Sequence, residues 1–460
     1  MVHFTNFFII LAFVVVVGAL VFTLDDLFID LQALIRKIKP RRVTADFISH
    51  IKQVPEKHIA ILIANWKEAE VLAPMIRGNL RALEYSNYTF FLGVYPNDLA
   101  TWEEARKLEE LYPHKVSVVV NSQAGPTSKG QMLNEMSRQI LKSEMSLGKK
   151  FELFLMQDSE DVLHPYSLSL MNEASLRADF VQIPVFSFDV PAKSLVAGIY
   201  IDEFAESHTK DLLVRKALGA AIPSAGVGTL ISRDLMMGLM ESPSGSFLKE
   251  DTLTEDYHLG MTAKQLGFKS DFVCVQYEKE NGDTEFIATR EYFPSSFQAS
   301  VRQKSRWTLG IAFQGLENLS WNGEWVDKYF MWRDRRGPWN SVLIVLSFLL
   351  LLCFVTLRRT EQLPSILRGD LFQILAGLNL LNMCIRILQR MKAVSLTNAR
   401  HHIALVPIRW VVANIVNVGA TSKAYRQLKE SQRTGKRPVW IKTEHRLPEH
   451  FGQDVEVQTP

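Results

Sequence analysis

The placement of long apolar runs constrains this chain more than any other feature. Residues 7–24 form an apolar run of eighteen residues, which is just long enough to cross a bilayer as a helix. No Lys or Arg precedes the run and no A-x-A site closes it, so we expect an uncleaved anchor rather than a cleaved signal peptide. Basic residues follow at 36–42, which predicts that the chain continues on the cytoplasmic side of the membrane.

More apolar stretches follow residue 340. Residues 341–356 and 371–385 predict two further spans. Residues 403–420 are also apolar, but a crossing there would leave the basic tail outside, against the positive-inside rule. Asn414, Asn417 and Thr421 lie along one helical face of this segment. We therefore predict an amphipathic helix on the inner membrane surface, with a fourth span as the alternative.

Basic and aromatic residues flank these apolar stretches. Trp332 and Trp339 bracket the run RDRR, which is typical of a cytoplasmic membrane interface. Arg386 and Arg390 follow the third apolar run and can reach the inner surface as well.

Residues 57–332 contain no run long enough to span a membrane. Short strand-like runs at 59–64, 90–95, 116–120, 151–156 and 180–185 alternate with helical patterns such as 67–83 and 101–112. This alternation predicts an α/β fold with a mostly parallel sheet covered on both faces. Ligands bind such sheets beyond the carboxyl ends of the strands, so the residues after each strand are the candidate site.

Composition excludes some function classes. The formal net charge of the 460 residues is +3, so we expect no nucleic-acid partner. Cys274, Cys353 and Cys384 have no metal or redox spacing, which argues against a disulfide framework and favours a reducing compartment for the soluble part. The His401–His402 pair shows no ligand spacing either, and we assign it no function.

The chain divides into seven expected parts. A transmembrane anchor (1–35) and a basic linker (36–56) come first, followed by a cytosolic α/β domain (57–300) and interfacial helices (301–340). Two transmembrane helices (341–390), an amphipathic interfacial helix (391–425) and a cytosolic tail (426–460) complete the chain.

Polar residues follow the first three predicted strands. Glu68 in NWKE and Asp98 in YPND suit hydrogen bonding to a base and a ribose. GPTSKGQMLN, residues 125–134, combines glycines that allow close backbone approach with Lys129, which can meet a phosphate. An ordinary loop before a helix capped near Thr127 explains the last segment equally well.

Three carboxylates follow the fourth strand, in QDSEDVLHP. Asp158, Glu160 and Asp161 would repel one another without a cation. Hard divalent ions such as Mg²⁺ or Mn²⁺ prefer such oxygen ligands, so we predict a metal site. A solvated acidic turn is the alternative.

Three further segments later in the chain carry candidate site residues. SAGVGT, residues 224–229, would let a ligand approach the backbone, and LTEDY opens a helix that Thr254 can cap. Either Glu255 or Asp256 would serve as a general base if it lay near an acceptor hydroxyl. VRQKSRWTLG then brings a Gln, an Arg and a Trp just ahead of the membrane stretches, and an amphipathic helix at a lipid surface is its simplest interpretation.

In this order the motifs resemble those of membrane-embedded, processive family-2 glycosyltransferases, such as cellulose and hyaluronan synthases. The resemblance is greatest to bacterial inner-membrane transferases named for bacteriophage adsorption. It covers nearly the whole chain and rests on LDDLFID, YPND, GPTSK, the acidic triplet, YIDEFAE, SAGVGT, LTEDY and REYFPSSF running into VRQKSRW.

The resemblance implies a Rossmann-like glycosyltransferase-A fold and an inverting, metal-dependent transfer from a nucleotide sugar, with a preference for uridine diphosphate donors. The residues it implies are Glu68, Asp98, Lys129, Asp158 and Arg306 for the donor, Asp158 and Glu160 for Mg²⁺ or Mn²⁺, Asp256 with Glu255 for base catalysis, and Gln303 and Trp307 for acceptor and product. It also implies a growing glycan or lipid-linked acceptor, membrane lipids and a periplasmic or outer-membrane export partner.

The chain departs from the family pattern in two motifs. The metal motif reads D-x-E instead of D-x-D, and Lys67 replaces the more usual Asn before the first acid. Longer relatives carry a tail thought to bind cyclic di-GMP, and we expect no such regulation from the residues after the last apolar stretch. Two alternatives to a processive synthase stay open: a transferase that adds one sugar to a lipid carrier, and a non-catalytic phage-receptor or secretion scaffold.

Overall fold

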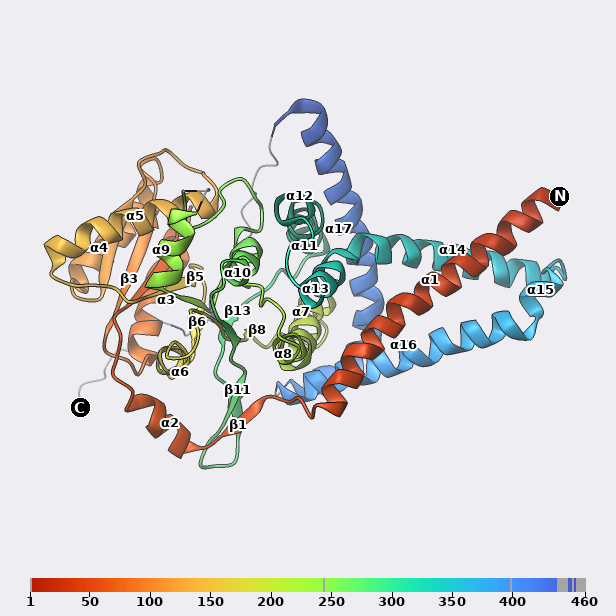
Figure 1. Ribbon diagram of the computed structural model, residues 1–460, viewed down its shortest axis with the longest axis horizontal. Helices are drawn as coiled ribbons and strands as arrows, with labels where there is room; N and C mark the ends of the chain where they lie inside the picture. The colour runs from red at the N-terminus through yellow and green to blue at the C-terminus, as the bar shows by residue number, and fades with distance from the viewer. Residues whose placement is uncertain (1, 243–244, 398, 437–445, 449–450, 452–460) are drawn as a thin grey trace.

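The computed structural model describes residues 2–242, 245–397, 399–436, 446–448 and 451. A seven-stranded sheet lies at the centre of its α/β domain (Figure 1). Along the sheet the strands are β10 (Ser270–Phe272), β7 (Phe180–Gln182), β9 (Thr229–Ser232), β5 (Leu153–Gln157), β2 (Ile59–Ala64), β3 (Tyr88–Val94) and β4 (Val116–Val120). β9 is antiparallel to both of its neighbours, and the other pairings are parallel.

Two three-stranded sheets extend the domain. Their strands are β1 (Arg41–Val43), β11 (Val275–Glu278) and β12 (Thr284–Phe286) in one, and β6 (Val162–Leu163), β13 (Thr289–Glu291) and β8 (Val185–Ser187) in the other.

The helices of this domain lie before, between and after the strands of the large sheet in the sequence. They are α2 (Ala45–Lys52), α3 (Ala69–Ala82), α4 (Leu99–Leu111), α5 (Lys129–Leu147), α6 (Ser167–Ala174), α7 (Leu195–Glu206), the π-helix η1 (Ser207–Asp211), α8 (Leu212–Ala217), α9 (Arg233–Glu241), α10 (Glu255–Gln265), α11 (Phe297–Thr308), the π-helix η2 (Leu309–Gln314), α12 (Gly315–Leu319) and α13 (Trp325–Arg335).

The strands of the large sheet are buried on both faces, because their side chains alternate between two apolar cores. Ile59, Ile61 and Ile63 of β2 pack in a core with residues of α3, α4 and α6. Ala60 and Leu62 pack in the opposite core, with residues of α5, α9 and α10. A strand buried on both sides reads as an uninterrupted apolar run, which is why IAILIA was recognisable in the sequence.

The structure confirms most of the predicted elements of the large sheet. β2 and β4 have the predicted bounds, β3 and β5 lie within two residues of theirs, and α3 and α4 cover the two predicted helices. The predicted strand at residues 180–185 is wrong, because it is two strands, β7 and β8, in different sheets. Pro184 lies between them and has no N–H for a ladder. The short central strand β9 was not predicted.

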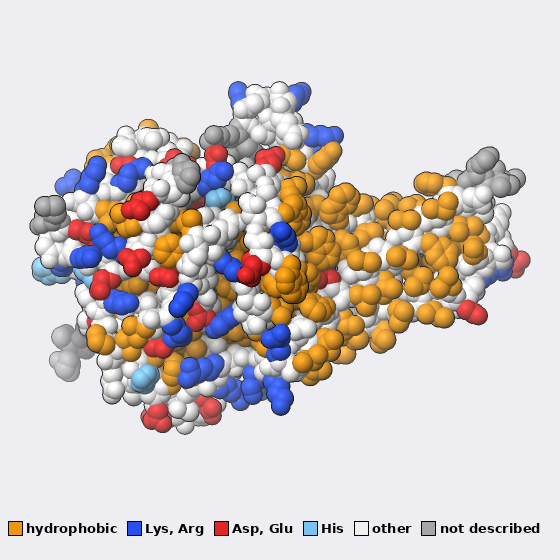
Figure 2. Space-filling model, in the orientation of Figure 1, with side chains coloured by type: hydrophobic (Ala, Val, Ile, Leu, Met, Phe, Trp, Pro, Cys, Tyr) orange, Lys and Arg blue, Asp and Glu red, His pale blue; other side chains and the backbone are white. Residues whose placement is uncertain are grey.

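Four helical segments of the described chain are long and apolar enough to cross a membrane. They are α1 (Val2–Ile35), α14 (Gly337–Arg359), α16 (Asp370–Leu396), and the 3₁₀ turn η3 (Arg400–Leu405) continued by α17 (Val406–Thr434). Between α14 and α16 lies the short α15 (Ser365–Arg368). α1, α14 and α16 run together away from the α/β domain (Figure 1), and their outer surface is apolar (Figure 2). These helices indicate a membrane protein.

α17 differs from the other three in direction. It runs across them and along the α/β domain, in contact with α7, α11 and α14 (Figure 1). Its Asn417 and Thr421 side chains bind residues of α11 and α14, while Ile408 and Ile415 are more than half exposed. The polar face of α17 therefore points into the protein, and an interfacial location for this helix stays a prediction.

Basic residues beside the membrane helices are ion-paired within the protein. The pairs join Arg333 and Arg336 to Asp25 and Asp26, and Arg386 and Arg390 to Glu206. We call these seven residues the junction clasp. Each guanidinium has a carboxylate partner on another helix, and the location of these arginines at a cytoplasmic membrane interface stays a prediction. The acids on α1 belong to the LDDLFID motif. Most of the tail expected at residues 426–460 lies outside the described residues.

Candidate functional site

A cavity of about 450 Å³ lies at the carboxyl ends of β2, β3 and β5 and extends to η1 and α13. Segments that are far apart in the sequence meet around it. The predicted site residues that line it are Glu68, Lys129, Asp158, Glu160, Glu255, Asp256, Gln303, Arg306 and Trp307.

Two aromatic rings form one end of the cavity. Trp66 and Tyr95 lie edge to face with their ring centroids 5.3 Å apart, and both line the cavity. Gly125 packs against both rings, since a Cβ added there would come within 2.6 Å of Trp66 and 2.7 Å of Tyr95. The glycine of GPTSK thus permits a close approach between two strand-end loops. Flat apolar walls of this kind can stack on a nucleobase.

Asp98 does not line the cavity, unlike the other predicted residues. Its buried carboxylate accepts a hydrogen bond from the backbone N–H of Lys67, with the two atoms 2.6 Å apart. Lys67 has a φ of 57°, a left-handed conformation that Asn adopts more readily than Lys. Asp98, which follows β3, therefore stabilises the strained backbone of Lys67, which follows β2.

The acidic triplet is divided between the cavity and the protein interior. Asp158 and Glu160 line the cavity, whereas Asp161 is 1% exposed and its carboxylate accepts a hydrogen bond from the backbone N–H of Asp158 at 2.6 Å. Burial, and then the charges of Glu291, Asp158 and Glu160, raise the pKa of Asp161 well above its usual value. Asp161 thus shapes the loop that carries the other two acids.

A lysine ammonium lies against the first of these acids. Lys129, at the start of α5, forms an ion pair with Asp158 and donates a hydrogen bond to the carbonyl of Gly226 at 3.3 Å. Burial opposes its charge, but the carboxylates of Asp158 and Glu255 raise the pKa of Lys129 above its ordinary value. A cation is therefore stable beside Asp158, and the two cavity-lining carboxylates offer the hard oxygen donors that Mg²⁺ and Mn²⁺ bind. These residues fit a divalent ion.

The T-E-D segment forms another wall of the cavity. Thr254 occupies the N-cap position of α10, but its hydroxyl makes no capping bond and has no partner among the described residues. Burial, followed by the charge of Asp256, raises the pKa of Glu255 to about 7. Burial also raises the pKa of Asp256, although the backbone N–H of Tyr257 and the cations Lys129 and Arg306 oppose the shift.

α11 contributes the basic and amide groups of the site. The guanidinium of its Arg306 makes no hydrogen bond or ion pair within the described part of the chain, and it lies close enough to lower the pKa values of Glu255 and Asp256. The side-chain carbonyl of Gln303 is buried and has no partner among the described residues. Trp307 lies edge to face with Tyr200, with 6.1 Å between the ring centroids. Arg306 therefore brings a guanidinium to the cavity, near the two carboxylates of the T-E-D segment.

The membrane-proximal end of the cavity was missed in the sequence. Its walls include Asp211, Arg215, Arg333 and Asp334. Arg215 Nη1 donates to both carboxylate oxygens of Asp334, at 2.9 Å each. His208 also lines the cavity, and burial lowers its pKa to about 4. Arg333 and Asp334 belong to the RDRR run, which the sequence placed at a membrane interface, and only the tertiary structure brings these residues to the cavity.

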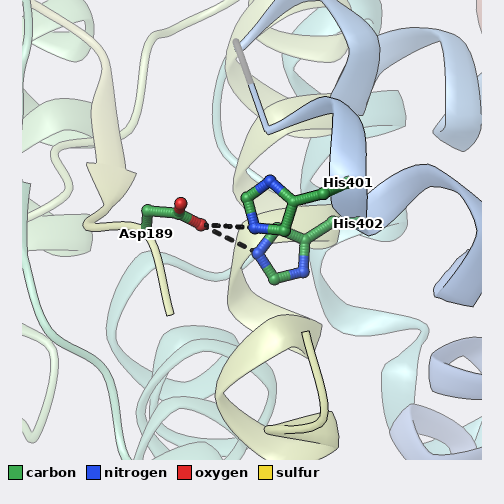
Figure 3. A group of neighbouring side chains, drawn as sticks. All are labelled: Asp189, His401 and His402. Atoms are coloured by element: carbon green, nitrogen blue, oxygen red, sulfur yellow. Dashed lines mark hydrogen bonds and ion pairs between the residues drawn. The ribbon is translucent and has the colours of Figure 1, made fainter. Parts of the chain in front are cut away.

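Asp189, His401 and His402 form the one group of three potential metal ligands that converges among the described residues (Figure 3). Asp189 Oδ1 lies 3.2 Å from His401 Nε2 and 2.9 Å from His402 Nε2. Arg409 Nη1 lies 2.9 Å from His402 Nδ1, and a guanidinium can only donate. His402 Nδ1 must therefore accept, which leaves the proton on Nε2, facing Asp189. A metal would need the Nε2 lone pair, so this arrangement favours a hydrogen-bonded link over a metal site.

Comparisons with known proteins agree with the sequence resemblance. Bacteriophage adsorption protein B of Escherichia coli K12 is 35% identical over 454 residues, an alignment that covers 93% of this chain and 61% of that protein. Bacteriophage N4 adsorption protein B of E. coli O157:H7 gives the same values. The chain thus spans about 61% of the length of the curated relatives it matches.

A solved structure has a similar fold. A mannosyltransferase from Pyrobaculum calidifontis, in complex with GDP-Man and Mn²⁺, superposes with a TM-score of 0.52 at 12% identity and covers 87% of this chain and 97% of its own. The mixed sheet with its helices is therefore glycosyltransferase-A-like, as expected. The model of the family described as glycosyltransferase like family 2 matches residues 55–310, more than half of the chain, and the protein belongs to that family.

Proposed function

We propose that this protein is a metal-dependent, inverting glycosyltransferase that transfers a sugar from a nucleotide-sugar donor to a growing glycan. The observation that supports the proposal is the meeting of acids, a guanidinium and aromatic rings around one cavity, from segments more than a hundred residues apart. Further proposals, from the resemblance, are a uridine diphosphate donor and processive synthesis with export of the product across the inner membrane.

The donor lies along the strand ends. Trp66 and Tyr95 hold the base, with Glu68 beside them. The guanidinium of Arg306 stabilises the charge that develops on the departing diphosphate, for which a planar, permanently charged fork is well suited. Asp98 acts on this end of the cavity through the backbone of Lys67.

Asp158 and Glu160 hold the divalent ion. When bound, the ion supplies positive charge to the diphosphate leaving group as a Lewis acid. Lys129 shares Asp158 and lies where it can contact the same phosphates. The structural relative solved with GDP-Man and Mn²⁺ represents the loaded state that we propose.

Asp256 accepts the proton of the acceptor hydroxyl as that hydroxyl attacks the anomeric carbon from the side opposite the leaving group. Its raised pKa makes it a stronger base than an exposed carboxylate. A single displacement inverts the anomeric configuration. Gln303 and Trp307 contact the acceptor and product sugars, with the indole face against a ring and the amide on hydroxyls.

We propose that the α/β domain faces the cytosol. The exposed basic residues after α1 support this orientation, because cytoplasmic segments next to a span carry an excess of Lys and Arg. α17, with its apolar outer face, lies at the inner surface beside the membrane lipids. The cavity extends towards the junction clasp, so a glycan leaving it would meet the membrane helices.

The test uses the full chain, purified in lipid nanodiscs, with UDP- and GDP-linked sugars, with and without Mn²⁺. We expect Mn²⁺-dependent release of nucleoside diphosphate from one donor. Asp256→Asn should lower kcat ~10²–10⁴-fold while donor binding persists, because general base catalysis contributes that much. Asp158→Ala should lose the response to Mn²⁺, and Asp234→Asn, at an exposed acid on α9, is the matched control.

Two outcomes would change the assignment. Neither binding nor turnover of any donor, with Asp158→Ala behaving like the wild type in cells, would overturn the enzyme and favour a scaffold. Mass spectrometry showing that only single sugars are added, to a lipid acceptor, would overturn processive synthesis.

A further inference from the structure

Lys304 lies within the Q-x-x-R-W segment but does not belong to the cavity. Gln303, Arg306 and Trp307 line the cavity, whereas Lys304 points away from it and is 6% exposed. A buried ammonium is costly unless every N–H finds an acceptor. The ammonium group of Lys304 therefore needs hydrogen-bond acceptors among its neighbours.

Three acceptors surround the ammonium group of Lys304. Its Nζ lies 2.7 and 2.6 Å from the two carboxylate oxygens of Glu203 on α7, and 3.1 Å from the side-chain oxygen of Asn417 on α17. The Nζ also lies 5.5 Å from the ring centroid of Tyr200. A lysine ammonium has three N–H donors, so this cluster satisfies all of them.

The same three helices pack closely around the cluster. A Cβ added to Gly419 of α17 would lie 3.2 Å from Val301 of α11. Tyr200 of α7 contacts Ser300 of α11, with 2.9 Å between their hydroxyl oxygens. α11 is thus held from two sides, and the Lys304 cluster joins α7, α11 and α17 through one charged group.

We propose that Lys304, Glu203 and Asn417 are positioning residues that set the rotation and depth of α11, and thereby the place of Arg306 in the cavity. The inference rests on the proposed function, because it concerns how Arg306 meets the departing diphosphate. Lys304 and Arg306 are two residues apart on a rigid helix, so a shift at one is passed to the other. A misplacement of about 1 Å at a reacting group can cost ~10²-fold in rate.

The inference gives α17 a function that its apolar composition did not indicate. Asn417 lies on the face with Asn414 and Thr421, and that face is turned towards α11 and α14. α17 therefore acts as a strut behind the Q-x-x-R-W helix, whatever its position relative to the bilayer. α17 carries the polar Asn417 where it meets α11, and the side-chain oxygen of Asn417 accepts a hydrogen bond from the Lys304 ammonium.

The experiment compares Lys304→Met, the milder Asn417→Ala, and the exchanged pair Lys304→Glu with Glu203→Lys. Arg302→Gln is the control, since Arg302 is an exposed cation on the same helix. Lys304→Met should lower kcat ~10–10²-fold with less than a threefold change in the donor KM, because Arg306 contributes chiefly in the transition state. The exchanged pair should have a kcat at least tenfold higher than that of Lys304→Met. Arg302→Gln should match the wild type.

A second readout separates this inference from the proposed function. Hydrogen–deuterium exchange at residues 297–308 should be at least threefold faster in Lys304→Met and Asn417→Ala, with α10 unchanged. If the wild type turned over no donor, the proposed function would fail while the exchange result would still decide whether the cluster holds α11. Unchanged exchange in both variants, or a kcat of Lys304→Met within twofold of the wild type, would overturn the inference.

Discussion

A side chain at Gly226 would collide with the carboxylate of Asp256. A Cβ built on Gly226 lies 2.7 Å from Asp256 Oδ2, and Gly226 has a φ of 82°. The carbonyl of the same residue accepts a hydrogen bond from Lys129. The glycine of SAGVGT therefore creates the space in which the proposed base lies.

Gly226→Ala should lower kcat at least ~10²-fold, because the new methyl group displaces Asp256 from its position. Gly219→Ala is the matched control: Gly219 has a φ of 76°, and nothing lies within 4 Å of an added Cβ. Both variants should lose about 1–2 kcal/mol of stability from backbone strain. Only Gly226→Ala should lose turnover, and equal kcat values for the two variants would contradict the assignment.

The pH dependence of turnover should reflect the Glu255–Asp256 pair. Burial and the charge of Asp256 raise the pKa of Glu255 to about 7, so the pair takes up a proton as the pH falls through neutrality. Burial also raises the pKa of Asp256, and the proposed base must be ionised, so kcat/KM should decrease as the pH falls into the acidic range. Glu255→Gln removes one charge from the pair and should move this decrease to lower pH. A pH–rate profile checks both, and an unmoved acidic limb in the variant would exclude Glu255 from the titration.

Lys67→Asn should stabilise the protein. Lys67 has a φ of 57°, which is costly for most side chains and less so for Asn, so the gain should be about 1 kcal/mol. The hydrogen bond from the Lys67 N–H to Asp98 uses only the backbone of residue 67 and should persist. Thermal unfolding in detergent measures the change. Lys107→Asn, at an exposed position within α4, should instead lose a few tenths of a kcal/mol of helix propensity.

The junction clasp should contribute strongly to stability through Glu206. Its side chain is 4% exposed and pairs with Arg386, Arg390 and Lys210. Glu206→Ala leaves the buried Arg390 without its ion-pair partner, while Arg386 and Lys210 keep Asp30, and should cost about 3–5 kcal/mol. Glu104→Ala, which breaks an ion pair with the exposed Lys107, should cost under about 1 kcal/mol. Comparable melting temperatures for the two variants would mean that water compensates the clasp arginines.

Much of this protein was determined by sequence alone. β2 and β4 were predicted with their bounds, because a strand buried on both faces reads as a short apolar run. The membrane helices α1, α14 and α16 were recognisable because each apolar run approaches the thickness of a bilayer. Nine of the ten predicted site residues line one cavity. Glu68, Lys129, Asp158 and Glu160 do so because parallel strands bring their carboxyl ends to one edge of a sheet, whereas the five residues on α10 and α11 reach the cavity through tertiary packing.

Tertiary structure decided what depends on contacts between distant segments. β9 is short and has no periodicity of its own, so its antiparallel place in the sheet comes from β5 and β7. The sequence showed Arg333 only as part of a basic run, and the fold of α1 brings Asp25 and Asp26 to it as ion-pair partners. The sequence does not show whether a charged side chain forms an ion pair, because the pair depends on how two distant segments are placed relative to each other. The chain encodes which groups it carries, and packing determines which of them are left free to meet a ligand.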